Sequence, residues 1–182
     1  MTIRLATAAD RAAIWKILEP IVRSGETYTL PCEMSEGDGL AYWFAAEHEV
    51  FACEEDGSIV GTYFLRANQK GGGSHVANCG YITAPAAQGR GIARAMCLDS
   101  IARAKERGFL AMQFNFVVST NSRAVTLWQG LGFEIVGRLP KAFRHPEKGL
   151  VDAFVMHLDF SRLNEGAANG RVASAEQPRG FG

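Results

Sequence analysis

A glycine-rich turn precedes a predicted helix near the middle of the chain. The stretch from Gln88 to Met96 reads QGRGIARAM, with Gly89 and Gly91 directly before the helical pattern. Glycine lets a backbone approach a ligand closely, and the first turn of a helix offers unpaired N–H groups and about half a positive charge. Together these features favour a bound phosphate. The turn lacks the Gly-Lys-Ser/Thr ending of a P-loop, so an ordinary strand-to-helix turn is the alternative.

The segment before this turn carries an amide and an imidazole. Residues 75–84 read HVANCGYITA and predict a strand that contains Asn78 and starts next to His75. Asparagine is disfavoured inside strands, so Asn78 is either a functional side chain or an ordinary strand amide. His75 adjoins a glycine-rich loop, where a solvated side chain is an equal alternative. The segment contains no Asp or Glu.

The rest of the chain predicts the elements that must position these residues. Their order is strand, two helices, three strands, helix, strand, helix and two strands, which indicates an α/β fold with antiparallel hairpins around one crossover helix. Asp56 and Gly57 give a strong hairpin signal. Thr7 and Asp10 form a capping-box pattern, and Asn121 is the predicted cap of the last helix.

Composition limits the size and the partners of the fold. The chain has 182 residues, of which 47% are hydrophobic, enough for one core, and we expect residues 1–160 to form a single domain. Residues 161–182 are small and polar, and we expect a disordered C-terminal tail. The 19 basic and 19 acidic residues balance, so no overall field favours nucleic acid or a membrane. The first ten residues predict a strand and a capped helix rather than a leader, which favours a cytoplasmic location.

The cysteines do not indicate a metal site or a disulfide framework. Cys32, Cys53, Cys79 and Cys97 are scattered and form no C-x-x-C pair. Their spacing favours small buried hydrophobic side chains, and we expect no metal.

The strand, the turn and the later segment STNSRAVTLWQGLGF occur in an order that resembles the GNAT superfamily of acyl-CoA-dependent N-acetyltransferases. The likeness extends from near residue 2 to near residue 160. It implies a mixed, mostly antiparallel twisted sheet of about seven strands with about four helices. In detail the chain is similar to the phosphinothricin-type branch and to fungal acetyltransferases of azetidine-2-carboxylate and proline analogues. The matches to the fungal group lie at 75–80, 114–115 and 120–121.

The resemblance implies a set of residues that bind acetyl-CoA. In the family, the turn matched by Gln88, Gly91 and Ala93 holds the pyrophosphate, and the preceding strand edge pairs with the pantetheine arm. The helix motif that begins at Asn121 lines the other side of the thiol end. The residues implied are Tyr81, Ile82, Thr83, Gln88, Gly89, Arg90, Gly91, Ile92, Ala93, Asn115, Asn121, Ala124 and Trp128.

The resemblance also implies the groups that act on the thioester. Asn78 is the leading catalytic candidate, with Tyr81 and His75 beside it, and the resemblance favours this role over an ordinary strand amide. Many relatives keep a carboxylate base on this strand, and here water held by Asn78 or His75 is the remaining local route for the amine proton. Many relatives carry a tyrosine acid where this chain has Trp128, and an indole gives up no proton near neutrality, which leaves water or Tyr81 as the acid. A backbone N–H near Ile82 is expected to stabilise the developing oxyanion.

Four residues are expected on the acceptor side of the site. Arg144 lies in the predicted loop before the last strand and could pair with a substrate carboxylate, although an ordinary surface loop is the alternative. Tyr28 and Trp43 either wall the cleft or fill the core. Asn78 completes the set.

The function implied is transfer of an acetyl group from acetyl-CoA to a small amine, an amino acid or an analogue, by direct attack of the neutral amine. No nucleic-acid or membrane partner is expected, and a homodimer stays open. One alternative is a protein N-terminal or lysine acetyltransferase. Another alternative is a non-catalytic acyl-CoA-binding domain. It stays open because the strand lacks a carboxylate base and because Trp128 replaces the tyrosine acid of many relatives.

Overall fold

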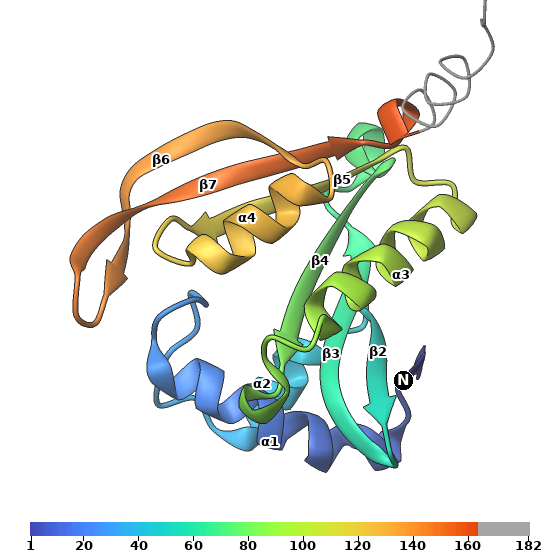
Figure 1. The fold of residues 1–182 in the computed structure, drawn as a ribbon, viewed down its shortest axis with the longest axis vertical. Helices are drawn as coiled ribbons and strands as arrows, with labels where there is room; N and C mark the ends of the chain where they lie inside the picture. Colours follow the sequence, from blue (N-terminus) through green and yellow to red (C-terminus); the bar gives the residue numbers. More distant parts are fainter. Residues whose placement is uncertain (164–182) are drawn as a thin grey trace, which may run out of the picture.

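The computed structural model describes residues 1–163; the expected C-terminal tail lies outside the described residues, apart from its first three positions. The strands are β1 (Thr2–Leu5), β2 (Glu49–Glu55), β3 (Ser58–Ala67), β4 (Val76–Thr83), β5 (Ala111–Val118), β6 (Glu134–His145) and β7 (Gly149–Asp159). The α-helices are α1 (Arg11–Ser24), α2 (Glu36–Trp43), α3 (Ile92–Glu106) and α4 (Ser122–Gly130). Short 3-10 turns lie at Ala8–Asp10, Gly71–Gly73 and Pro85–Ala87. This mixed fold confirms the predicted class (Figure 1).

The local signals in the sequence form the expected turns and caps. Asp56 and Gly57 have φ of 50° and 73° in the β2–β3 hairpin. The Thr7–Asp10 capping box opens the turn that leads into α1. The Asn121 side chain accepts a hydrogen bond from the Ala124 N–H and caps α4.

The strands form one sheet in the order β1-β2-β3-β4-β5-β7-β6. Every neighbouring pair is antiparallel except β4 and β5, which are parallel. That parallel pair is joined only at Val76 with Ala111 and Ala77 with Met112. Beyond these residues the two central strands part, and the sheet opens in its middle.

Helices cover both faces of the sheet. Tyr63 and Leu65 of β3 belong to one buried cluster with Met96 of α3. The intervening Phe64 belongs to a second cluster with Trp43 of α2 and with side chains of α1. Since successive strand residues point to opposite faces, α3 lies on one face and α1 with α2 on the other.

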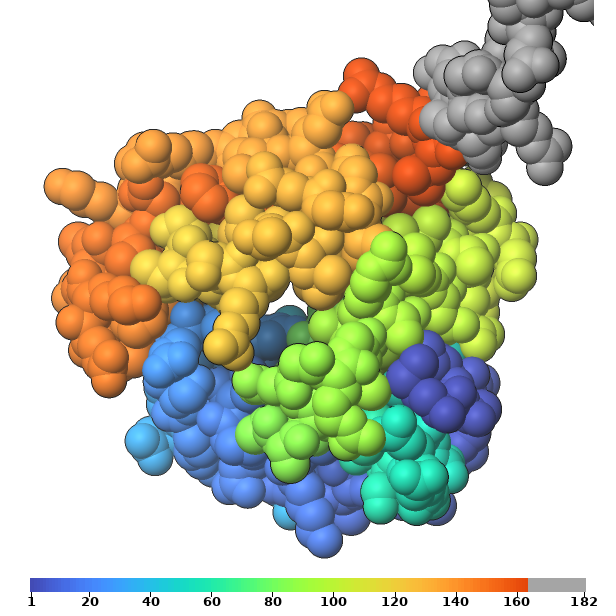
Figure 2. Space-filling model, viewed as in Figure 1, coloured from blue at the N-terminus to red at the C-terminus, as the bar shows by residue number. Residues whose placement is uncertain are grey.

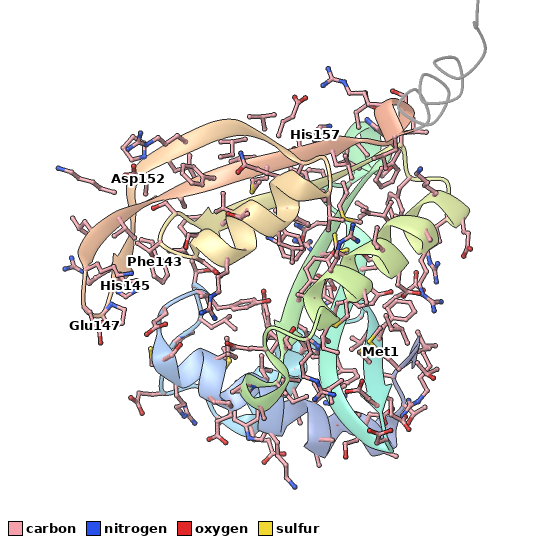
Figure 3. The ribbon with its side chains drawn as sticks, in the orientation of Figure 1. Met1, Phe143, His145, Glu147, Asp152 and His157 are labelled. Atoms are coloured by element: carbon pink, nitrogen blue, oxygen red, sulfur yellow. The ribbon has the colours of Figure 1, made fainter. Side chains whose placement is uncertain are left out.

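The hairpin of β6 and β7 is longer than the sequence pattern predicts. Residues 143–145, expected in a loop, belong to β6 and pair with 149–151 of β7. The register of β6 against β7 is irregular between Leu139 and Phe143, and Lys141 has a φ of 53°. This irregularity interrupts the alternation of apolar and polar residues, so the sequence pattern does not show that the strand continues. Figure 3 labels Phe143, His145 and Glu147 near the tip of this ribbon.

No helix within residues 1–163 has the length and apolarity needed to cross a membrane.

Candidate active site

The parting of β4 and β5 opens a cleft of about 1210 Å³. One wall comes from α4 and from the turn that begins α3, and the other from the loop that follows α1. Figure 2 shows the molecule hollowed between the start of α3, in green, and α4, in yellow. The cleft therefore gives access to the sheet from both of its faces.

The glycine-rich turn closes one end of this cleft with exposed backbone. Gly89 and Gly91 have φ of 78° and 80°, which favours glycine at both positions. Gly91 is the N-cap of α3 and supplies no side-chain cap, whereas α2 and α4 are capped by Ser35 and Asn121. The first N–H groups of α3 therefore have no side-chain acceptor, and this geometry fits an anionic phosphate.

Most of the predicted turn residues line the cleft, but the Arg90 side chain does not. Gln88, Gly89, Gly91, Ile92 and Ala93 contribute to its wall. Arg90 instead forms an ion pair with the carboxylate of Glu55, at the end of β2, and so its side chain points away from the cleft.

Two other arginines line the cleft on this side, Arg94 in α3 and Arg123 in α4. The sequence patterns did not single out Arg123. The sequence feature that could have indicated Arg123 is its position two residues after the Asn121 cap, in the first turn of a helix that faces the cleft.

The register of β4 decides which backbone groups face the gap. The Ala84 N–H donates to the Val60 carbonyl, and the Asn68 N–H donates to the Val76 carbonyl. In an antiparallel pair the groups of alternate residues face the partner strand, so even-numbered β4 residues face β3. The N–H groups of Tyr81 and Thr83 face the gap. The N–H of Ile82 faces β3, so the backbone donor expected near Ile82 would come from one of these two neighbours.

The Tyr81 side chain points into the core beneath α3. Its hydroxyl lies 2.7 Å from the Ser100 hydroxyl, and its ring centroid lies 5.1 Å from that of Trp128. Burial raises the Tyr81 pKa well above its ordinary value, so this phenol holds its proton more tightly than a free tyrosine. Its position favours packing in the wall of the cleft over the acid role. Trp128 lines the same wall and is only 7% exposed.

Asn78 lies on the opposite face of β4 and uses both ends of its amide. Its oxygen accepts from Arg66 Nε at 3.3 Å, and its nitrogen donates to the Gln113 carbonyl of β5 at 2.8 Å. The side chain is 7% exposed. Asn78 therefore bridges the two strands where they part and orients the Arg66 guanidinium toward the cleft.

A second amide lies on the Asn78 face. Asn115 of β5 donates to the Asn68 side chain at 2.7 Å and accepts from the Gln113 side chain at 2.9 Å. Phe114, its neighbour in the strand, packs in the cluster under α3 and α4. Asn115 therefore lines the α1 and α2 side of the cleft, and the cofactor-binding role that the resemblance implies for it stays a prediction.

Three predicted residues do not reach the cleft. His75 precedes β4 and lines a separate hollow with Lys105 and His157. Trp43 is 0% exposed, and its indole N–H donates to the Thr62 hydroxyl at 3.1 Å, so it fills the core. Arg144 is exposed on β6 between two buried neighbours, because alternate strand residues point to opposite faces.

Tyr28 does line the cleft, together with residues that the sequence patterns missed. Its hydroxyl donates to the Tyr81 carbonyl at 3.0 Å. The missed residues on the same side include Glu26, Tyr42, Phe64, Arg66 and Phe116. Arg66 stands at the end of the apolar run TYFLRA, where a single charge resembles an ordinary solvated strand end.

The described residues contain no group of three or more His, Cys, Asp or Glu side chains arranged to hold a metal ion. Cys53, Cys79 and Cys97 are buried free thiols, as expected, while Cys32 is exposed.

Strands that part beside an uncapped helix start form the arrangement that the sequence resemblance implied for N-acetyltransferases using acyl-CoA. The sequence model of the Acetyltransferase (GNAT) family matches residues 14–133, which is well over half of the chain. The chain therefore belongs to the GNAT acetyltransferase family.

Relatives support this assignment. A GCN5-related N-acetyltransferase from Kribbella flavida is 39% identical, with a TM-score of 0.83 over 87% of this chain and 97% of that chain. The N-acetyltransferase aca1 of Schizosaccharomyces pombe is 24% identical over 79% of this chain and 77% of its own length. A phosphinothricin acetyltransferase from Sinorhizobium meliloti, solved in complex with AcCoA, shares the fold at 21% identity, with a TM-score of 0.76 over 87% of each chain.

Proposed function

We propose that this protein transfers the acetyl group of acetyl-CoA to the amino nitrogen of a small acceptor that carries a carboxylate, such as an amino acid or an analogue. The observation that carries this proposal is the cleft between β4 and β5. It has an uncapped helix start on one face of the sheet and the Arg66 guanidinium on the other. The helix start suits the anionic nucleotide part of acetyl-CoA, and the Arg66 side suits an amine that carries a carboxylate.

The part of the cleft proposed to bind acetyl-CoA uses backbone groups more than side chains. The N–H groups at the start of α3 suit the pyrophosphate, and Arg94 and Arg123 add positive charge nearby. The free edge of β4 beyond Ala77 suits the amide groups of the pantetheine arm, because β5 leaves that edge unpaired. Trp128 and Ala124 then form the wall of the cleft around the thiol end of acetyl-CoA.

Acetyl transfer needs a donor for the carbonyl oxygen as it gains charge. The N–H groups of Tyr81 and Thr83 face the gap and are the backbone candidates for this role. A backbone donor requires no particular side chain, which suits a β4 strand without an acidic residue. Holding the amine against the thioester in this cleft supplies much of the remaining rate gain.

The proton of the attacking amine has few protein acceptors. Among the described residues that line the cleft, the one carboxylate is Glu26, on the loop after α1. Glu26 is exposed, so it and the water around it offer a route for the proton out of the acceptor side.

Arg66 favours an acceptor with a carboxylate. It is half-buried, lines the cleft, and is absent from the salt bridges formed among residues 1–163. A partly desolvated guanidinium without a carboxylate partner is a strong site for one supplied by a ligand.

The test is thiol release from acetyl-CoA with three matched groups of acceptors: free amino acids, the corresponding amines without the carboxylate, and short peptides. We expect the free amino acids to give the highest kcat/KM. Turnover confined to peptides would support a protein acetyltransferase instead. Thermal stabilisation by acetyl-CoA without turnover on any acceptor would indicate a non-catalytic binding domain.

A further inference from the structure

Tyr28 connects the acceptor loop to the strand that faces the thioester. It lies in the segment between α1 and α2, and its ring packs edge-on against Trp43 with centroids 6.2 Å apart. Its hydroxyl reaches the Tyr81 carbonyl at 3.0 Å, across 53 positions of sequence. The ring is therefore anchored in the core while the hydroxyl ends on β4.

The strand leaves room for this contact at Gly80. A Cβ atom at this position would come within 2.5 Å of the Phe64 ring and 3.3 Å of the Tyr28 hydroxyl oxygen. Gly80 thus lets the Tyr28 hydroxyl lie against the bare backbone of β4. Burial raises the pKa of Tyr28 above its ordinary value, so the hydroxyl stays protonated and remains a donor.

The carbonyl that Tyr28 contacts is one that β5 leaves without a strand partner. Tyr81 is an odd-numbered β4 residue, so both its N–H and its carbonyl face the gap. An unpaired carbonyl there would place a partial negative charge near the site where the acetyl oxygen gains charge. A hydrogen bond from Tyr28 both satisfies the carbonyl and fixes the peptide orientation.

We infer that Tyr28 is a positioning residue for acetyl transfer, because its hydroxyl holds the 81–82 peptide, which lies between the two peptides whose N–H groups, those of Tyr81 and Thr83, face the gap. This role rests on the proposed function. The same loop supplies Glu26, Thr27 and Thr29 to the cleft wall, so Tyr28 also links the acceptor loop to the cofactor strand.

The test compares the wild-type protein with Tyr28→Phe, which keeps the ring against Trp43 and removes only the hydroxyl. We expect kcat to fall about tenfold, the scale of one lost hydrogen bond, while the Kd for acetyl-CoA and the KM for the acceptor change less than about threefold. Hydrogen exchange of the amides in residues 79–84 should become about tenfold faster without added ligand.

Tyr42→Phe is the matched control, since it removes a hydroxyl from the same cleft that has no described hydrogen bond to β4. It should leave exchange in 79–84 at the wild-type rate. Unchanged exchange in Tyr28→Phe would overturn the inference whether or not the protein turns over any amine. An effect confined to the acceptor KM would also overturn it, because Tyr28 would then only wall the pocket. Faster exchange in Tyr28→Phe, together with wild-type protein inactive on every acceptor, would instead reject the proposed function and retain the backbone contact.

Discussion

At the residue scale, Arg66 and Asn78 form the unit that distinguishes the acceptor side of the cleft. Asn78 accepts from the Arg66 Nε, which leaves the terminal nitrogens of the guanidinium for other partners. Because Asn78 also donates to the Gln113 carbonyl, the position of Arg66 depends on the point where β4 and β5 part. Under the proposed function, selectivity for the acceptor therefore depends on the geometry of the gap.

Arg66→Gln should raise the KM for a free amino acid by roughly tenfold to a hundredfold, because it removes a charge-assisted contact with the carboxylate. The KM for the corresponding amine without a carboxylate should stay within about threefold of wild type. Steady-state kinetics with the two acceptors measures this difference. Equal loss for both acceptors would mean that Arg66 supports the fold and not the substrate.

Asn78→Ala should lower kcat/KM by roughly tenfold to a thousandfold, the range expected when one positioned polar group is lost. Both ends of the Asn78 amide already have protein partners, so the expected loss comes from breaking the link between Arg66 and the Gln113 carbonyl of β5. Circular dichroism and thermal unfolding should confirm that the variant folds. Wild-type kinetics in a folded Asn78→Ala protein would remove Asn78 from the site.

At the element scale, a charged cluster fastens the first strand and α1 to the sheet. Arg4 of β1 contacts the Asp10 carboxylate at 2.8 Å and the Glu54 carboxylate of β2 at 3.1 Å. Asp10 also accepts from the backbone and hydroxyl of Thr7. This cluster lies away from the cleft and fixes the start of the helix whose C-terminal loop carries Tyr28.

The cluster predicts a pH dependence of stability. The hydrogen bond from Arg4 lowers the Asp10 pKa below its ordinary value, so the folded state binds this proton more weakly than the unfolded state. The resulting stabilisation is complete above the unfolded pKa of about 3.9 and is lost as pH falls toward the folded pKa. Asp10→Asn should therefore lower the Tm at pH 7, and its difference from wild type should shrink below pH 4. A constant difference across thermal melts from pH 7 to pH 2.5 would contradict this account.

At the scale of the whole molecule, the sequence predicts the elements better than it predicts which way their side chains point. Turn and cap signals at Asp56-Gly57 and Asn121 act locally, and the structure contains both. Side-chain direction depends on strand register, where a shift of one residue exchanges the two faces. The sequence alone therefore does not show that the N–H of Ile82 faces β3 or that the Arg144 side chain points outward.

Other site residues depend on contacts between distant segments. Trp43 and Tyr28 are both aromatic residues near the first two helices, yet one fills the core and the other reaches the Tyr81 carbonyl. The role proposed for Arg66 rests on its pairing with Asn78 and on its absence from the described salt bridges. No local pattern carries that information.

The packed domain also extends beyond the expected boundary at residue 160. Leu163 packs against the core cluster under α3, and Arg162 forms an ion pair with Glu134 at 2.6 Å. Local patterns do not predict this packing, because these residues stand in a stretch that is otherwise small and polar.

The central claim is that acetyl-CoA binds at the glycine turn that begins α3, and calorimetric titration of three proteins tests it most directly. Gly91→Val places a side chain where the phosphate would lie, whereas Gly108→Val makes the same change just beyond the other end of the helix. Both glycines have a φ of 80° and open space at the Cβ position, so the two variants carry similar backbone strain. We expect wild type and Gly108→Val to bind acetyl-CoA with affinities within about threefold, and Gly91→Val to lose at least about a hundredfold. Wild-type affinity in Gly91→Val would contradict the account.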